Sequence, residues 1–273
     1  MSLDPGQLSP GARALYAPYW SRLGHEVRRL PPELPELVRW AAAARPATST
    51  GMPIRFEASG GMPANDYETT IQQTGRVPTR VGDWHDGFNA LVWCTFPATK
   101  AALNAAHDEQ IRRGAAMGRG VVRDALTLFD ECGALVLSAD PDWIDQLRAH
   151  RWREALFDAR DCPDLQREII VMGHATLDAL RSPFFGLCAK VLYRQVPESW
   201  FAQPESTRWR DADDWMAAWL RGRGDTLGPR DFAPLPLLGW PAVVAENAAE
   251  SYYADPRQFR PRRQAGLAGL RCR

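Results

Sequence analysis

Apolar residues recur at helical spacing in the stretch that follows Asp83. The stripe comprises Trp84, Phe88, Leu91, Val92 and Thr95. Residues spaced in this way share one face of a helix and are typical of a buried side. Asp83 is a favourable N-cap, and Pro97 is suited to begin a second helix directly after the first. The pattern therefore predicts adjacent helices over 83–95 and 97–113, with Trp84, Phe88, Leu91 and Leu103 buried.

Other segments of the chain carry shorter patterns. Residues 10–29 and 33–44 are predicted to be helices, with Pro18 kinking the first or delaying its start. A short strand is expected at Pro53–Glu57, and Asp66 is a candidate cap for a helix through Gln73 that Gly75 would close. Further elements are expected as two helices in 141–159, strands at Glu168–Met172 and Leu187–Tyr193, and helices from His174 and over Ala212–Arg221.

Two apolar runs, Ala125–Asp130 and Ala134–Leu137, flank Glu131-Cys132-Gly133. They predict a β-hairpin in which Gly133 takes the positive-φ position, and in which Asp130 and Glu131 are solvated turn formers without a catalytic role. Pro234–Pro241 holds too many prolines for regular structure, and 242–273 is expected to be a tail with a short helix. Together these elements indicate an α+β fold, a helix-rich single domain around a small mixed or antiparallel sheet.

Composition limits the classes of partner. The 273 residues have a formal net charge of zero, so no global field favours nucleic acid or an anionic membrane. The arginines near the C-terminus are typical of a solvated end. No run of about 18 apolar residues and no signal-like N-terminus is present, which indicates a cytoplasmic protein without a membrane span. Only two of the 33 basic residues are lysines, a bias typical of a GC-rich bacterial genome.

Several strings resemble a bacterial family catalogued as domain of unknown function 3025. They are Tyr67-Glu68, Val77-Pro78-Thr79-Arg80, Trp84 to Lys100, Arg123 to Glu131, Gly173-His174-Ala175, Pro234-Leu235-Pro236, Asn247 and Phe259-Arg260-Pro261. The resemblance implies one main domain over 50–262, and it implies no activity, cofactor or catalytic residue. Residues 1–49 then form an N-terminal helical segment packed on that body, and 263–273 form a basic tail.

His85 and Asp86 stand where the helix predicted at 83–95 begins. Asp86 falls in the first turn, where the helix dipole favours a carboxylate by about 0.3–1 kcal/mol, so the helix start accounts for it. Nothing local requires a histidine at position 85, which lies beside Asn89 at i,i+4. Because a helix N-terminus disfavours imidazolium, we expect His85 to be neutral and able to act as a base or a metal ligand.

Two further histidines have competing interpretations. His174 follows Gly173 at a predicted strand-to-helix turn, a common place for active-site residues, and Asp178 one turn later could orient its ring. The alternative is a histidine that caps or packs the turn. His107 lies in line with Leu103 on an apolar stripe, where a histidine is more often part of the core than a ligand.

The candidate site combines His85, His174 and one or both of Asp86 and Asp124. It is either an acid/base pair or two histidines and a carboxylate around a divalent metal. Arg80 and Asn89 are candidates to hold a substrate. If the site exists, the two imidazoles should lie within roughly 10 Å of each other, so that one small ligand reaches both.

Two functions remain open at this point. The first is an enzyme acting on a small polar or anionic metabolite. The second is a non-catalytic binding or interaction protein, in which the 11 tryptophans include a recognition surface. No G-x-S-x-G, H-E-x-x-H or Walker motif is present to decide between them. A cavity shared by His85 and His174 would favour the enzyme.

Overall fold

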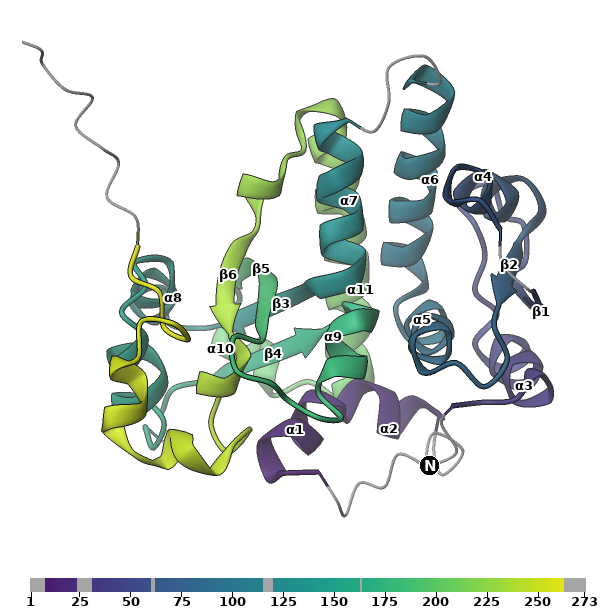
Figure 1. The fold of residues 1–273 in the computed structure, drawn as a ribbon. Helices are drawn as coiled ribbons and strands as arrows, with labels where there is room; N and C mark the ends of the chain where they lie inside the picture. Colours follow the sequence, from purple (N-terminus) through teal and green to yellow (C-terminus); the bar gives the residue numbers. More distant parts are fainter. Residues whose placement is uncertain (1–7, 24–30, 60–61, 115–119, 163, 263–273) are drawn as a thin grey trace, which may run out of the picture.

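The computed structural model describes residues 8–23, 31–59, 62–114, 120–162 and 164–262 (Figure 1). Within these residues, the helices are α1 (Pro10–Leu15), α2 (Ala17–Leu23), α3 (Leu34–Ala44), α4 (Ala64–Thr74), α5 (Trp84–Thr95), α6 (Pro97–Gly114), α7 (Val121–Cys132), α8 (Pro141–Arg148), α9 (His174–Ala179), α10 (Glu198–Phe201) and α11 (Glu205–Arg223). The strands are β1 (Arg55–Ala58), β2 (Arg76–Thr79), β3 (Gly133–Ser138), β4 (Arg167–Val171), β5 (Cys188–Gln195) and β6 (Ala233–Pro236). The predicted helix-rich α+β class with a small mixed sheet is confirmed.

The larger sheet has four strands in the order β4-β3-β5-β6. β3 pairs antiparallel with β4 and parallel with β5, and β5 pairs antiparallel with β6. All six residues of β3 are buried, as expected for a central strand covered on both faces. The prediction that Pro234–Pro241 lacks regular structure was wrong for β6. An edge strand needs hydrogen-bond donors on one side only, so it tolerates prolines that a central strand would exclude.

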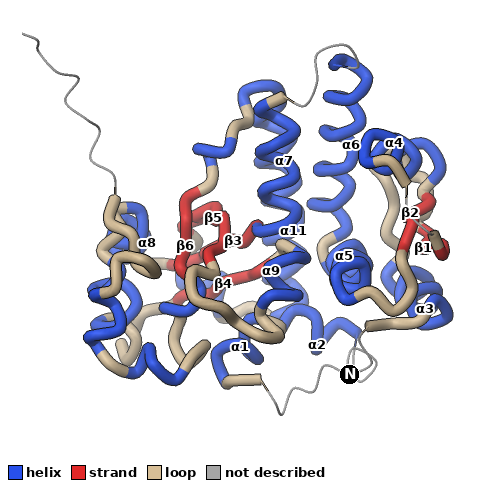
Figure 2. Tube along the Cα trace, viewed as in Figure 1, coloured by secondary structure: helices blue, strands red, loops and turns tan. Residues whose placement is uncertain are grey.

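The smaller sheet is a parallel pair of β1 and β2, joined by α4. It lies on the opposite side of α5, α6 and α7 from the four-stranded sheet (Figure 2). The strand predicted at 53–57 is therefore present but shifted, whereas β2 was not predicted. Asp66 lies in the first turn of α4 and does not cap it, but Gly75 closes the helix with a φ of 69°, as expected.

The predicted adjacent helices are confirmed as α5 and α6. Asp83 caps α5, its carboxylate accepting a hydrogen bond from the Asp86 amide at 3.0 Å. Phe88 and Leu91 on α5 are fully buried, as is Leu103 on α6. The prediction for Trp84 was wrong, because this ring is only partly buried. It instead lies under the guanidinium of Arg181, which is 3.5 Å from the ring centroid.

The hairpin predicted over 125–137 was wrong. Residues up to Cys132 form α7, and only Gly133 onward is a strand. Ala125, Leu126 and Phe129 are buried along one side of α7, so the apolar run that suggested a strand is a helical face. Gly133 has a φ of −70° and does not take the positive-φ position. Its smallness is needed for another reason, since a Cβ there would lie 2.2 Å from the Phe129 carbonyl oxygen.

The N-terminal helices are tied to the four-stranded sheet and to α9. The helix predicted from residue 10 breaks at Tyr16, just before Pro18, and residues 24–30 of that prediction lie outside the described residues. The buried Tyr19 hydroxyl donates to the Val171 carbonyl at 2.6 Å, and the Tyr16 hydroxyl donates to the Leu177 carbonyl. These two bonds fix α1 and α2 beneath the strand-to-helix turn that carries His174 (Figure 1).

Of the C-terminal segment predicted over 242–273, residues up to 262 fold back on the body, and the predicted basic tail over 263–273 lies outside the described residues. It contains short 3₁₀ turns at Ala245–Ala248 and Glu250–Ala254. The buried Tyr253 hydroxyl donates to the Gly239 carbonyl at 2.9 Å, and Phe259 is 4% exposed. Across the part of the chain that the structure describes, no helix combines the length and the apolar character needed to cross a membrane.

Replacing Phe88 by alanine tests the packing of α5. This ring is fully buried, with Tyr16 and Trp84 each stacked at a centroid distance of 6.0 Å. We expect Phe88→Ala to lower the free energy of unfolding in urea by about 3–5 kcal/mol. Phe184, which is 58% exposed, provides the matched control, and Phe184→Ala should cost no more than about 0.5 kcal/mol. Similar losses in both variants would contradict this packing.

Candidate metal centre

A cavity of about 480 Å³ opens between α4, α5, α7 and α9. Its size is that of a typical small-molecule site. The residues that line it are Ser59, Met62, Tyr67, Glu68, Pro78, Arg80, His85, Asp86, Asn89, His107, Arg123, Thr127, Asp130, Glu131 and His174. Most of these side chains are polar or ionisable, which indicates a site for a polar or charged ligand.

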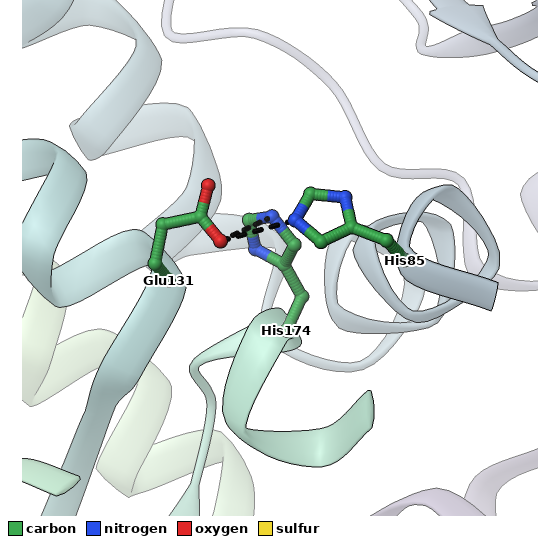
Figure 3. A group of neighbouring side chains, drawn as sticks. All are labelled: His85, Glu131 and His174. Carbon is green, nitrogen blue, oxygen red and sulfur yellow. Dashed lines mark hydrogen bonds and ion pairs between the residues drawn. The ribbon is translucent and has the colours of Figure 1, made fainter. Parts of the chain in front are cut away.

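His85, His174 and Glu131 meet at one point of this cavity (Figure 3). His85 Nε2 lies 3.1 Å from Glu131 Oε2, and His174 Nε2 lies 3.4 Å from the same oxygen. The two imidazole rings are edge to face, with centroids 4.5 Å apart. The two rings therefore lie within the predicted separation of roughly 10 Å, and their use by one ligand stays a prediction.

The three side chains come from three helix ends. His85 is in the first turn of α5, Glu131 in the last turn of α7, and His174 is the first residue of α9. Gly173 brings the last two together, because a Cβ at this position would lie 2.5 Å from the Glu131 carbonyl oxygen. The Gly173 amide also donates to the Gly133 carbonyl at 2.8 Å. Only glycine permits so close an approach between two backbones.

Each histidine has a second carboxylate on its other ring nitrogen. His85 Nδ1 lies 3.4 Å from Asp86 Oδ1, and His174 Nδ1 lies 3.8 Å from Asp130 Oδ2. The two aspartates are in turn held by cations. Arg80 contacts Asp86 through its backbone amide and its guanidinium, with Nη2 at 2.8 Å, and the buried Lys100 Nζ lies 2.6 Å from Asp130.

These contacts shift the pKa values of the two histidines in opposite directions. Hydrogen bonds to Asp86 and then to Glu131 raise the pKa of His85 to about 10. Burial lowers the pKa of His174, and this exceeds the opposing effect of Asp130. The expectation that His85 stays neutral at its helix N-terminus was therefore wrong for the metal-free protein, because two carboxylates outweigh the helix dipole.

The carboxylates of the cluster are held in their ionised form. Burial alone would raise the pKa of Glu131, but the hydrogen bond to His85 and the nearby His174 lower it overall. Burial likewise opposes ionisation of Asp130, but Lys100, His174 and His107 together more than compensate, so the pKa of Asp130 is also lowered. A cation that replaces the proton shared by His85 and Glu131 would therefore meet ionised oxygen donors.

The separations around Glu131 are compatible with a single divalent ion. With metal–ligand distances of about 2.0–2.2 Å, neighbouring ligand atoms lie roughly 2.8–3.1 Å apart around an octahedral ion and roughly 3.3–3.6 Å apart around a tetrahedral one. Glu131 Oε2 lies 3.1 and 3.4 Å from the two Nε2 atoms, and one ligand atom from each of the three residues lies within 4.8 Å of the others. Metal-binding histidines also commonly direct their other ring nitrogen to a carboxylate, as His85 does toward Asp86. His174 Nδ1 also lies near a carboxylate, Asp130, but at 3.8 Å it makes no hydrogen bond.

The predicted site residues have different locations. Arg80, Asp86 and Asn89 line the same cavity as the two histidines. The guanidinium of Arg80 is paired with Asp86 and Asp83, and Asn89 donates to the Tyr67 hydroxyl at 3.0 Å. Their roles toward a substrate stay predictions. Asp124, in contrast, is exposed in the first turn of α7 and does not line the cavity.

Glu131 is the functional candidate that sequence reasoning missed. The prediction that Asp130 and Glu131 are solvated turn formers without a catalytic role was wrong, because both carboxylates lie against His174. A helical interpretation of 121–132 would have found Glu131, since Arg123, Thr127 and Glu131 follow at intervals of four and share the face that lines the cavity.

Two other expectations about histidines need correction. His107 is buried, as expected of a core residue, but it also lines the cavity. Asp178 does not orient His174, because its carboxylate pairs with Arg181 at 2.5 Å. Asp130 and Glu131 occupy the positions around the His174 ring that were expected of Asp178.

The fold and site define a helix-rich α+β protein with two histidines and one glutamate converging in a polar cavity. The chain belongs to the family described as "Protein of unknown function (DUF3025)", whose model matches residues 54–263. No curated protein and no solved structure is significantly similar to it. This match confirms the resemblance that the sequence strings indicated. The family description names no activity.

The raised pKa of His85 makes the stability of the metal-free protein depend on pH. The folded-state pKa of about 10 exceeds the usual 6.5, so the charged ring stabilises the fold fully below about pH 6.5, and this stabilisation is lost as pH rises toward 10. We expect the free energy of unfolding of the wild type to fall toward that of His85→Gln over this interval. Urea titrations in a chelating buffer measure it, and a pH-independent difference between the two proteins would contradict the assignment.

Proposed function

We propose that this protein is an enzyme that uses a single divalent metal ion, held by His85, His174 and Glu131, to act on a small anionic molecule in the adjoining cavity. The observation that carries the proposal is the convergence of both Nε2 atoms on one oxygen of Glu131. Two histidines and one carboxylate form the protein ligand set of catalytic zinc and non-haem iron sites, which leave open positions for water or substrate.

The charge balance of the cavity supports an anionic substrate. The carboxylates of Asp86, Asp130 and Glu131 are matched by three cations, Arg80, Arg123 and Lys100. A bound divalent ion therefore leaves an excess of positive charge, which persists when Glu68 is ionised. Such a cavity attracts a carboxylate or phosphate group more strongly than a cation.

The Tyr67–Asn89 pair supports recognition of a polar group. Asn89 is 8% exposed, and its Oδ1 is buried without a hydrogen bond while Nδ2 donates to the Tyr67 hydroxyl. If the amide is turned the other way, the Tyr67 hydroxyl donates to Asn89 and an amide N–H is left over. In the first arrangement the hydroxyl proton of Tyr67, which lines the cavity, remains for a ligand. In the second arrangement the remaining amide N–H occupies the buried position of Oδ1.

A metal-free acid/base enzyme is the second candidate. The environments of His85 and His174 move their pKa values in opposite directions, a pattern typical of an acid and a base that share one site. A non-catalytic binding protein is the third, and it would use the cavity without turnover. In all three proposals the partner is a small molecule. The lysine-poor composition supports a bacterial source, and we propose a cytoplasmic location.

Calorimetric titration of the chelator-treated protein with Zn²⁺, Mn²⁺ and, without oxygen, Fe²⁺ tests the metal proposal. We expect one ion per chain. His85→Ala, His174→Ala and Glu131→Gln should each weaken binding by more than about 100-fold, beyond the 10–100-fold typical of outer partners such as Asp86.

The matched control for the glutamate is Asp124→Asn, because Asp124 lies on the same helix as Glu131 but is exposed and outside the cavity. This variant should bind the ion within about two-fold of the wild type, as expected for a substitution distant from the ligands. Absence of a bound ion in the wild type, or equal losses in Asp124→Asn and Glu131→Gln, would refute the metal site and leave the acid/base enzyme as the leading candidate.

A further inference from the structure

Glu68 is a carboxylate in the cavity that neither the triad nor its outer partners use. It projects from α4 and lines the same cavity as His85, Glu131 and His174. Because the cavity has the size of a small-molecule site, a ligand that extends from the triad through the cavity would reach Glu68.

The hydrogen bonds of Glu68 hold its carboxylate in place. Asn104, which is 2% exposed, donates from Nδ2 to Glu68 Oε2 at 2.7 Å and to the Glu68 backbone carbonyl at 2.9 Å. Among the described residues, Oε1 accepts no hydrogen bond and no cation pairs with the carboxylate. Two other carboxylates of the cavity are paired with cations: Asp86 with Arg80, and Asp130 with Lys100.

The surroundings of Glu68 also favour uptake of a proton near neutral pH. Burial raises the pKa of Glu68 to about 7, the Asn104 hydrogen bond and the nearby Lys100 and Arg123 oppose the rise, and Asp130 adds to it. A second cavity of about 10 Å³ lies between Glu68, Asn104, His107 and Asp130. That volume suffices for roughly one water with several polar partners, which would connect Glu68 to the groups behind the triad.

We propose that Glu68 is the general base of the site, which makes the proposed metal enzyme a hydrolase. The inference rests on the proposed metal site. A bound ion would polarise a water molecule and the scissile group of the substrate. Glu68 would take a proton from that water while the water oxygen bonds to the carbonyl carbon or phosphorus, and it would return the same proton to the leaving group as the bond to that group breaks. Glutamates with a raised pKa serve in this way in other enzymes.

Acetohydroxamic acid tests this role without a known substrate. When a hydroxamic acid binds to a zinc ion, its O–H bond breaks, its oxygen binds the ion, and its proton passes to a neighbouring base or to the buffer. Titration calorimetry of the zinc-loaded protein at pH 8, in two buffers of different ionisation enthalpy, counts the protons released. We expect almost none from the wild type, because Glu68 retains the proton.

Glu68→Gln should release nearly one proton per ligand and bind acetohydroxamic acid about ten-fold or more weakly, since its neutral amide accepts no proton. One zinc per chain in this variant establishes that it is folded. Asp66→Asn is the matched control, since Asp66 is an exposed acid on the same helix and lies outside the cavity. It should give the wild-type proton count.

The wild type alone provides a second test. As pH is lowered through the pKa of Glu68, this carboxyl already carries a proton before the ligand binds, and the release should rise toward one. Equal proton counts in wild type and Glu68→Gln, a wild-type count that does not change with pH, or failure of acetohydroxamic acid to bind the zinc-loaded protein would overturn the role of Glu68. Failure to bind zinc would instead refute the metal site, so the two proposals fail separately.

Discussion

The backbone of Gly173 lies directly against the junction of α7 and β3, and the candidate site depends on this contact. The amides of Met172 and Gly173 both donate to the Gly133 carbonyl, at 3.0 and 2.8 Å. At this distance there is no room for a Cβ on residue 173. The next residue, His174, therefore starts α9 beside the last turn of α7, where Glu131 stands. The packing of α5 against α9 then supplies His85 from a third helix end.

Charge pairing explains how so many ionised groups can share one cavity. Each histidine lies between Glu131 and an aspartate, and each aspartate is held by a cation from another segment, Arg80 or Lys100. Buried charges are tolerated when they are paired in this way. In the metal-free protein the charge on His85 offsets that of Glu68 when Glu68 is ionised. A divalent ion would replace that charge and leave the surplus that we propose attracts an anionic substrate.

The helices with a clear apolar stripe could be predicted from the sequence, whereas the glutamate of the site could not. The boundary between α5 and α6 follows from Phe96-Pro97. His85 was a candidate because nothing local requires a histidine there, and His174 was a candidate because it follows Gly173 at a predicted strand-to-helix turn. Glu131 was missed because a short apolar run before a glycine fits a strand as well as a helix. Its proximity to both histidines depends on contacts between segments about 40 residues apart, which spacing alone does not reveal.

Crystals of the protein grown with zinc, measured at wavelengths on either side of the zinc absorption edge, would locate the ion in the cavity. We expect one anomalous difference peak per chain, about 2.0–2.2 Å from His85 Nε2, His174 Nε2 and Glu131 Oε2. Further ligand density, if present, should extend into the cavity toward Glu68. A peak at another group of side chains, or the two imidazoles turned away from each other with no peak between them, would contradict the proposed metal site.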